Sequence, residues 1–234
     1  MSEWKARRFW TEARVEPHAA GFTVRLDGRP VKTPGKTELT VPSEALAHEI
    51  AREWDAQEGT IDPRTMPFTR AANSAIEKVA PQHAEVADML AGYGDSDLTC
   101  YRADSPEGLV ARQAEAWDPL LDWAEATFGA RLIPVEGVMH QPQSAAALDR
   151  LAAEVHAMTH WELTGFHDLV ALSGSLVIGL AAARDAWTPE ELWQRSRVDE
   201  TWQEEQWGED AEAAAMAAAK RQDFLQAHRF LKLL

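Results

Sequence analysis

The pattern of hydrophobic and polar residues changes its period after residue 42. Before that point, apolar residues alternate with polar ones at Phe22, Val24 and Leu26, which is the period of a half-buried β-strand. Asp27-Gly28 follows directly, and this dipeptide favours a tight hairpin turn when alternating residues flank it. We therefore predict a small β-rich domain at residues 1–42.

From Ser43 onward, apolar residues recur at helical spacing. Ser43 is placed to act as an N-cap, and Leu46, Ile50 and Trp54 then fall on one helix face. Cap, proline and glycine signals predict further helices at residues 71–79, 81–91, 105–129, 144–158, 161–184, from 188 onward, and 211–230. The fold class is therefore α+β, with the β-rich domain followed by a larger, mainly α-helical domain at residues 43–234.

Residues 188–212 combine tryptophan with many carboxylates. Thr188, Pro189 and Glu191 form a helix start signal with the spacing of a capping box. Seven acidic residues and no basic residue lie between positions 199 and 212, and Gly208 interrupts the helical pattern. The pattern alone favours a solvated acidic helix with buried tryptophans over a surface that contacts a partner.

The net charge of −15 argues against non-specific binding to nucleic acid or to anionic membranes. The longest apolar run, at residues 169–183, is too short to span a bilayer, so we expect no membrane insertion. Its small residues, among them Gly179, favour a helix packed closely inside a bundle. The charged N-terminus has neither a secretory signal nor the composition of a transit peptide. We expect a soluble, cytoplasmic protein.

Enzymatic chemistry has few candidates. Cys100 is the one cysteine and is expected to be buried as a small apolar residue. His156 and His160 share a helix face, and His167 follows, so a metal-dependent hydrolase is one alternative function. The hydrolytic zinc motif requires Glu after the first histidine, where this chain has Ala157. Phosphate-loop, dinucleotide and nucleophile-elbow motifs are missing, and we expect no enzyme and no cofactor.

Several long segments match one family of proteins. They are RRFW, FTVRLDGRPVKTP, LTVPSEALAHEIAREWDAQ, IDPRTMPFTRAANSAI, residues 93–102, RQAEAWDPLLDW, LVALSGSLVIGLA and SRVDETWQEEQWGEDAEA. Through these segments the chain resembles the ATP synthase assembly chaperones of the ATP12 type, which occur in mitochondria and in some bacteria. The resemblance covers nearly the whole chain, and without a transit peptide the chain is similar to a bacterial version.

The resemblance implies a function and a site. Family members bind the free α subunit of the ATP synthase catalytic head and cover the surface that the β subunit later occupies. They are not known as enzymes and need no cofactor; we expect a monomer. The resemblance implies a partner-binding set of Glu200, Gln203, Glu205, Trp207, Gly208 and Glu209. The functionally important glutamate of the family is placed at Glu200, with Glu205 and Glu209 as rivals. A general protein-interaction adaptor is a further alternative.

Overall fold

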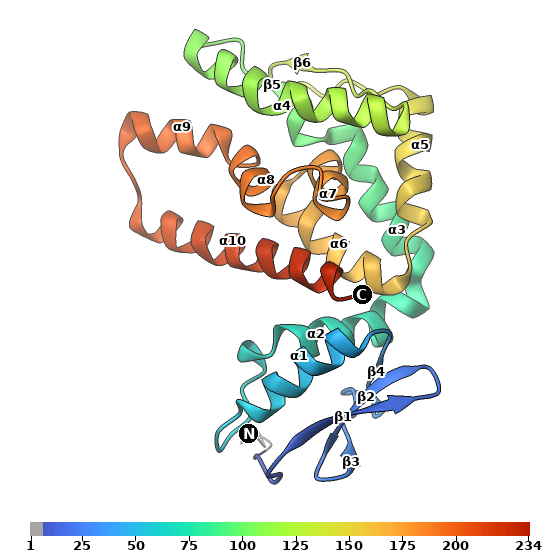
Figure 1. Cartoon of the computed structure of the whole chain (residues 1–234). Coiled ribbons are helices and arrows are strands. Elements are labelled where there is room, and N and C mark those ends of the chain that lie inside the picture. Colours follow the sequence, from blue (N-terminus) through green and yellow to red (C-terminus); the bar gives the residue numbers. More distant parts are fainter. Residues whose placement is uncertain (1–6) are drawn as a thin grey trace. The chain divides into compact units, whose positions relative to one another are not determined.

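The structure is a computed structural model that describes residues 7–234, and it contains two compact units (Figure 1). The first unit contains the chain up to Gln82 together with His160–Thr164 and Arg229–Leu234. The second unit contains His83–Thr159 and Gly165–His228. Strands near the N-terminus followed by a mainly helical chain confirm the predicted α+β class.

A four-stranded antiparallel sheet lies in the first unit. It is formed by β1 (Ala13–His18), β2 (Gly21–Leu26), β3 (Arg29–Pro30) and β4 (Thr40–Val41), with β2 paired to each of the others. Asp27 and Gly28 connect β2 to β3 and have φ angles of 47° and 82°. Two positive φ angles in a two-residue connection are what a type I′ hairpin turn requires. The turn predicted from the sequence is confirmed.

Helices α1 (Glu44–Asp55) and α2 (Pro67–Ser74) complete this unit, with a 3₁₀ turn at Pro63–Thr65 and a π-helical turn at Ala75–Val79. Ser43 caps α1 by accepting a hydrogen bond from the backbone N–H of Leu46 at 3.1 Å. Leu46 and Ile50 are fully buried, because α1 covers one face of the sheet. The compact unit that holds the sheet therefore extends well beyond the 1–42 range expected for a β-rich domain.

The second unit is built from helices. They are α3 (His83–Ala91), α4 (Glu107–Phe128), α5 (Ala145–His156), α6 (His160–Ser173), α7 (Leu176–Ala183), α8 (Pro189–Arg195), α9 (Val198–Trp207) and α10 (Ala211–Lys232), of which α6 begins and α10 ends in residues of the first unit. Short 3₁₀ turns occur in this unit at Gly92–Ser96 and Leu98–Cys100, and another, at Ala80–Gln82, ends the first segment of the first unit. Strand β5 (Tyr101–Arg102) pairs in parallel with β6 (Val135–Glu136). Within residues 7–234, no helix combines the length and hydrophobicity needed to cross a bilayer.

The helix expected over residues 161–184 is two helices. Gly174 has a φ of +70° and ends α6, and Ser175 caps α7 by accepting the backbone N–H of Ile178 at 3.0 Å. The buried carboxylate of Asp97 accepts hydrogen bonds from the Ser175 hydroxyl at 2.7 Å and from the Val177 N–H at 3.0 Å. These hydrogen bonds from the start of α7 to Asp97 hold the N-terminus of the helix in place, and the apolar pattern of the segment does not predict them.

Helix α4 also differs from its prediction at the start. The sequence predicts Pro106 at the first helical position, but the helix begins at Glu107 and Pro106 precedes it with extended backbone angles of −73° and 160°. Gly129 ends α4 in the left-handed region, with φ of 64°, as the sequence predicts.

Candidate partner-binding site

The site begins with α8, whose capping box forms as the sequence predicts. The Thr188 hydroxyl accepts the backbone N–H of Glu191 at 3.2 Å, and the Glu191 carboxylate accepts the backbone N–H of Thr188 at 2.9 Å. These hydrogen bonds from Thr188 lower the pKa of Glu191. The chain then turns at Ser196 and Arg197 before α9 begins. The acidic residues 199–212 therefore follow directly after a capped helix.

One face of α9 is occupied by contacts to α4. Asp199 accepts a hydrogen bond from Gln113 at 2.6 Å, and Glu205 pairs with Arg112 at 2.8 Å. The Arg112 guanidinium also lies 5.0 Å from the centroid of the Trp202 ring. Glu205, a member of the predicted partner-binding set, therefore has an intramolecular partner in the free chain.

The opposite face of α9 is exposed. Glu200, Gln203, Glu204 and Trp207 follow the i, i+3, i+4, i+7 spacing and therefore share one side of the helix. Trp207 is 80% exposed. It is the one tryptophan among the exposed large apolar side chains of the described residues. Glu200 accepts a hydrogen bond from Arg197 at 2.5 Å, whereas Glu204 makes no ion pair within residues 7–234.

Gly208 ends α9 with a φ of +92°, a conformation that favours glycine, and confirms the predicted break. Glu209 is exposed in the connection that follows. Asp210 starts α10 by accepting the backbone N–H groups of Glu212 at 2.8 Å and Ala213 at 3.1 Å. The structure thus brings Glu200, Gln203 and Trp207 onto one helix face, with Gly208 and Glu209 next in the chain, and turns Glu205 away from that face.

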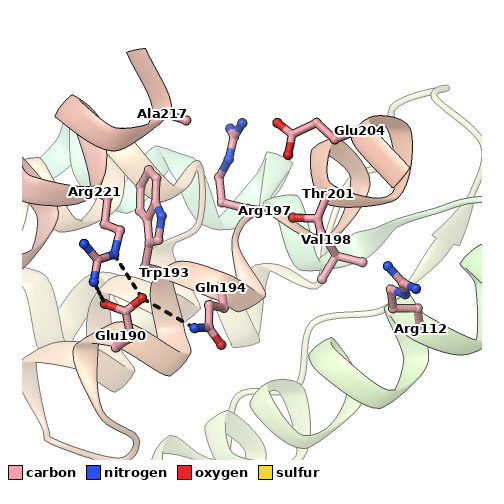
Figure 2. Close-up of a pocket in the computed structure, with 10 residues that line it drawn as sticks. All are labelled: Arg112, Glu190, Trp193, Gln194, Arg197, Val198, Thr201, Glu204, Ala217 and Arg221. Atoms are coloured by element: carbon pink, nitrogen blue, oxygen red, sulfur yellow. Dashed lines mark hydrogen bonds and ion pairs between the residues drawn. The ribbon is translucent and has the colours of Figure 1, made fainter. Parts of the chain in front are cut away.

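A pocket of about 450 Å³ lies between α4, α8, α9 and α10 (Figure 2). It is lined by Arg112, Glu190, Trp193, Gln194, Arg197, Val198, Thr201, Glu204, Ala217 and Arg221. Trp193 is only 5% exposed and packs against Phe224, with ring centroids 5.7 Å apart, so it belongs to the core. Of the three tryptophans in residues 188–212, Trp193 is buried, Trp202 is half-buried, and only Trp207 is exposed.

An ion pair forms one wall of this pocket. Arg221 of α10 binds Glu190 of α8 through both carboxylate oxygens, with Nε 2.9 Å from Oε1 and Nη2 2.5 Å from Oε2. The hydrogen bonds from Arg221 lower the pKa of Glu190. The sequence analysis did not predict Glu190, Arg221 or Glu204 as part of a site. The pair of Glu190 with Arg221, and the absence of an ion pair at Glu204 in residues 7–234, depend on tertiary packing.

The candidates for enzymatic chemistry do not converge. His156 pairs with Asp88 at 2.9 Å, and His167 pairs at the same distance with Asp168, whose hydrogen bond raises the pKa of His167. No group of three or more His, Cys, Asp or Glu side chains in residues 7–234 is arranged to hold a metal ion. Cys100 is buried as predicted, and burial raises the pKa of its thiol to about 12, so the thiol stays protonated at neutral pH.

Comparisons with known proteins identify relatives along the whole chain. Residues 7–125 match the family model described as ATP12 chaperone protein. The crystal structure of Atp12 from Paracoccus denitrificans is 50% identical, with a TM-score of 0.96 and 99% of each chain covered. The structure of Atu1473 from Agrobacterium tumefaciens, described as a proposed chaperone, is 41% identical, with a TM-score of 0.92, covering 97% of this chain and 85% of that one.

A curated relative comes from a eukaryote. The mitochondrial protein atp12 of Schizosaccharomyces pombe is 26% identical, over 88% of this chain and 75% of the relative. The resemblance drawn from the sequence segments is confirmed by the family model and by both bacterial structures. The chain belongs to the ATP12 family of chaperones.

Proposed function

We propose that this chain is an ATP synthase assembly chaperone that binds the unassembled α subunit and shields the surface that later meets the β subunit. Family membership supports a role in assembly. The observation that carries the client-binding proposal is the exposed face of α9, where Trp207 is 80% exposed beside carboxylates. A large exposed aromatic group next to polar side chains is typical of a protein-binding surface.

The two kinds of side chain on this face have different tasks. Trp207 supplies apolar area and covers apolar client surface that would otherwise aggregate. The carboxylates attract client lysine and arginine and fix the orientation of the complex. The complex must be released when the β subunit arrives, so we expect an interface smaller than that of an obligate dimer.

Binding of purified α subunit tests the proposal directly. Wild-type chaperone, expected to be a monomer when free, should form a complex that elutes as one species in size-exclusion chromatography. It should also suppress light scattering from unassembled α subunit. Trp207→Ala should weaken the complex at least about tenfold, since tryptophan is a common hot-spot residue. Met139→Ala is the matched control, because Met139 is 76% exposed elsewhere in the same unit.

The role of Glu200 is tested by charge reversal. Glu200→Lys should weaken binding of the α subunit while leaving the chaperone folded, since Glu200 is only half-buried and pairs locally with Arg197. Asp223→Lys is the control, because Asp223 is an exposed acid on α10. If Glu200→Lys binds the α subunit as well as wild type, Glu200 is not the client-binding glutamate.

A pull-down from native cell extract tests the rival functions. Selective recovery of the α subunit supports the proposed function, whereas an unselective mixture of proteins supports a general adaptor. Elemental analysis of chaperone purified without chelators tests the hydrolase alternative. One zinc ion per chain would contradict the proposal of a chaperone that needs no metal.

A further inference from the structure

The pocket between α4, α8, α9 and α10 contains one acidic side chain that forms no ion pair within residues 7–234. Each of the three arginines in the lining pairs with a carboxylate: Arg221 with Glu190, Arg197 with Glu200, and Arg112 with Glu205. The remaining charged residue of the lining is Glu204, which forms no ion pair within residues 7–234. Glu204 is therefore the one charged side chain of the lining without an ion-pair partner in the described residues.

Three apolar side chains also line the pocket. They are Trp193 of α8, Val198 of α9 and Ala217 of α10. Figure 2 shows the Glu204 side chain extending from α9 toward the open space that also receives Arg197. The Arg197 guanidinium lies 5.8 Å from the centroid of the Trp193 ring, so the surface of this indole already accommodates a cation.

A pocket that combines apolar side chains with a carboxylate free of ion pairs fits one class of client side chain. Lysine and arginine carry a long aliphatic stem that can pack on apolar surface, and a cationic end that seeks a carboxylate. A volume of about 450 Å³ accommodates such a side chain. An acidic client group would instead have to separate an arginine from its present carboxylate partner, which is unfavourable in a partly buried site.

We infer that Glu204, in the pocket between α4, α8, α9 and α10, receives a lysine or arginine side chain of the α subunit, whose aliphatic stem packs against Trp193 and Ala217. This inference rests on the proposed function and names the client group that the pocket recognises. Glu204 offers an unoccupied carboxylate, whereas a client cation at Glu200 must compete with Arg197. Glu204 and Trp207 lie three residues apart, so both contacts can form on one helix face.

Affinity measurements with three variants test the inference. Purified α subunit is titrated into wild-type chaperone, Glu204→Gln, Glu204→Lys and Ala217→Leu. Glu204→Gln should weaken binding about fivefold and Glu204→Lys more than about tenfold, as for loss and reversal of a close interfacial charge pair. Ala217→Leu should weaken binding without a change of charge, because it fills the pocket. The matched control is Asp223→Lys, an exposed acid on α10 without an ion pair in residues 7–234.

The outcomes separate this inference from the proposed function. If wild type fails to bind the α subunit, the proposed function itself is wrong. If wild type binds, but Glu204→Lys and Ala217→Leu bind equally well, the pocket is not used and the inference is wrong. Tighter binding by Glu204→Gln would show that the pocket receives an acidic group and would also overturn it. Circular dichroism and urea unfolding establish that each variant is folded.

Discussion

Arg112 and Glu205 form an ion pair that joins α4 to α9, with Arg112 Nη1 2.8 Å from Glu205 Oε2. The same guanidinium lies over the Trp202 ring, so one arginine holds two positions of α9. Glu204, the preceding residue, lines the pocket between these helices and has no ion pair in residues 7–234. Two adjacent glutamates therefore have different roles, one in the fold and one at the surface.

This difference predicts unequal effects on stability. Arg112→Ala should lower the free energy of unfolding by about 1–2 kcal/mol, because it removes an ion pair and a cation–π contact. Glu204→Ala should change it by less than about 0.5 kcal/mol, since an exposed side chain without partners is removed. Urea unfolding at neutral pH measures both values. Equal losses would contradict the assignment of Arg112 and Glu204 to different roles.

The tryptophans in residues 188–212 predict a second difference in stability. Trp193→Ala should cost about 3–5 kcal/mol, because Trp193 is buried against Phe224 and the truncation leaves a cavity. Trp207→Ala should leave the unfolding free energy within about 0.5 kcal/mol of wild type, since the side chain is 80% exposed. Thermal unfolding followed by circular dichroism distinguishes the two. A large loss of stability in Trp207→Ala would give Trp207 a structural role instead of a client contact.

Local signals in the sequence were sufficient for the elements that depend on neighbouring residues. The turn at Asp27-Gly28, the cap at Ser43 and the capping box at Thr188 each involve residues within four positions of one another, and each is confirmed. The break at Gly208 is confirmed for the same reason, because a positive φ favours glycine at that position. Short-range backbone chemistry is visible in a single sequence.

The arrangement of the site depends on contacts that a single sequence does not reveal. Arg112 and Glu205 are 93 positions apart, and only their contact shows which side of α9 faces the protein. The pattern of residues 188–212 therefore could not separate Glu204 from Glu205, or Trp207 from Trp193. The 1–42 range similarly omitted α1, because its packing against the sheet is a tertiary relationship. The partner-binding set remains a prediction for the binding experiments above.

A buried carboxylate in the first unit predicts a pH effect. Glu53 of α1 accepts hydrogen bonds at the start of α2 from the backbone N–H groups of Phe68 at 2.6 Å and Thr69 at 2.7 Å. Burial raises the pKa of Glu53 above its ordinary value of 4.5, against the opposing hydrogen bonds. The folded chain therefore takes up this proton more readily than the unfolded chain. The resulting stabilisation is complete below pH 4.5 and is lost as the pH rises through the folded pKa.

Removal of this titrating group measures the effect. As the pH falls from 7 toward 5, the unfolding free energy of wild type should increase relative to that of Glu53→Gln, which cannot take up the proton. Glu58→Gln is the control, because Glu58 is an exposed acid just beyond the same helix. Urea unfolding at several pH values gives the difference. A difference between wild type and Glu53→Gln that is independent of pH would contradict the raised pKa.

Close packing of α6 against α7 predicts an intolerance to added volume at Gly179. A Cβ atom there would lie 2.5 Å from Val170 Cγ2 and 3.2 Å from Phe166 Cε2, and all three residues are buried. Gly179→Val should therefore destabilise the chain by about 1–3 kcal/mol, because the neighbouring side chains must leave their positions. Gly92→Val is the matched control, since Gly92 is exposed and an added Cβ meets no atom within 4 Å. Urea unfolding should show a loss of unfolding free energy for Gly179→Val and none for Gly92→Val. Equal stability of the two variants would mean that α6 and α7 have room to separate, which would contradict their close packing at Gly179.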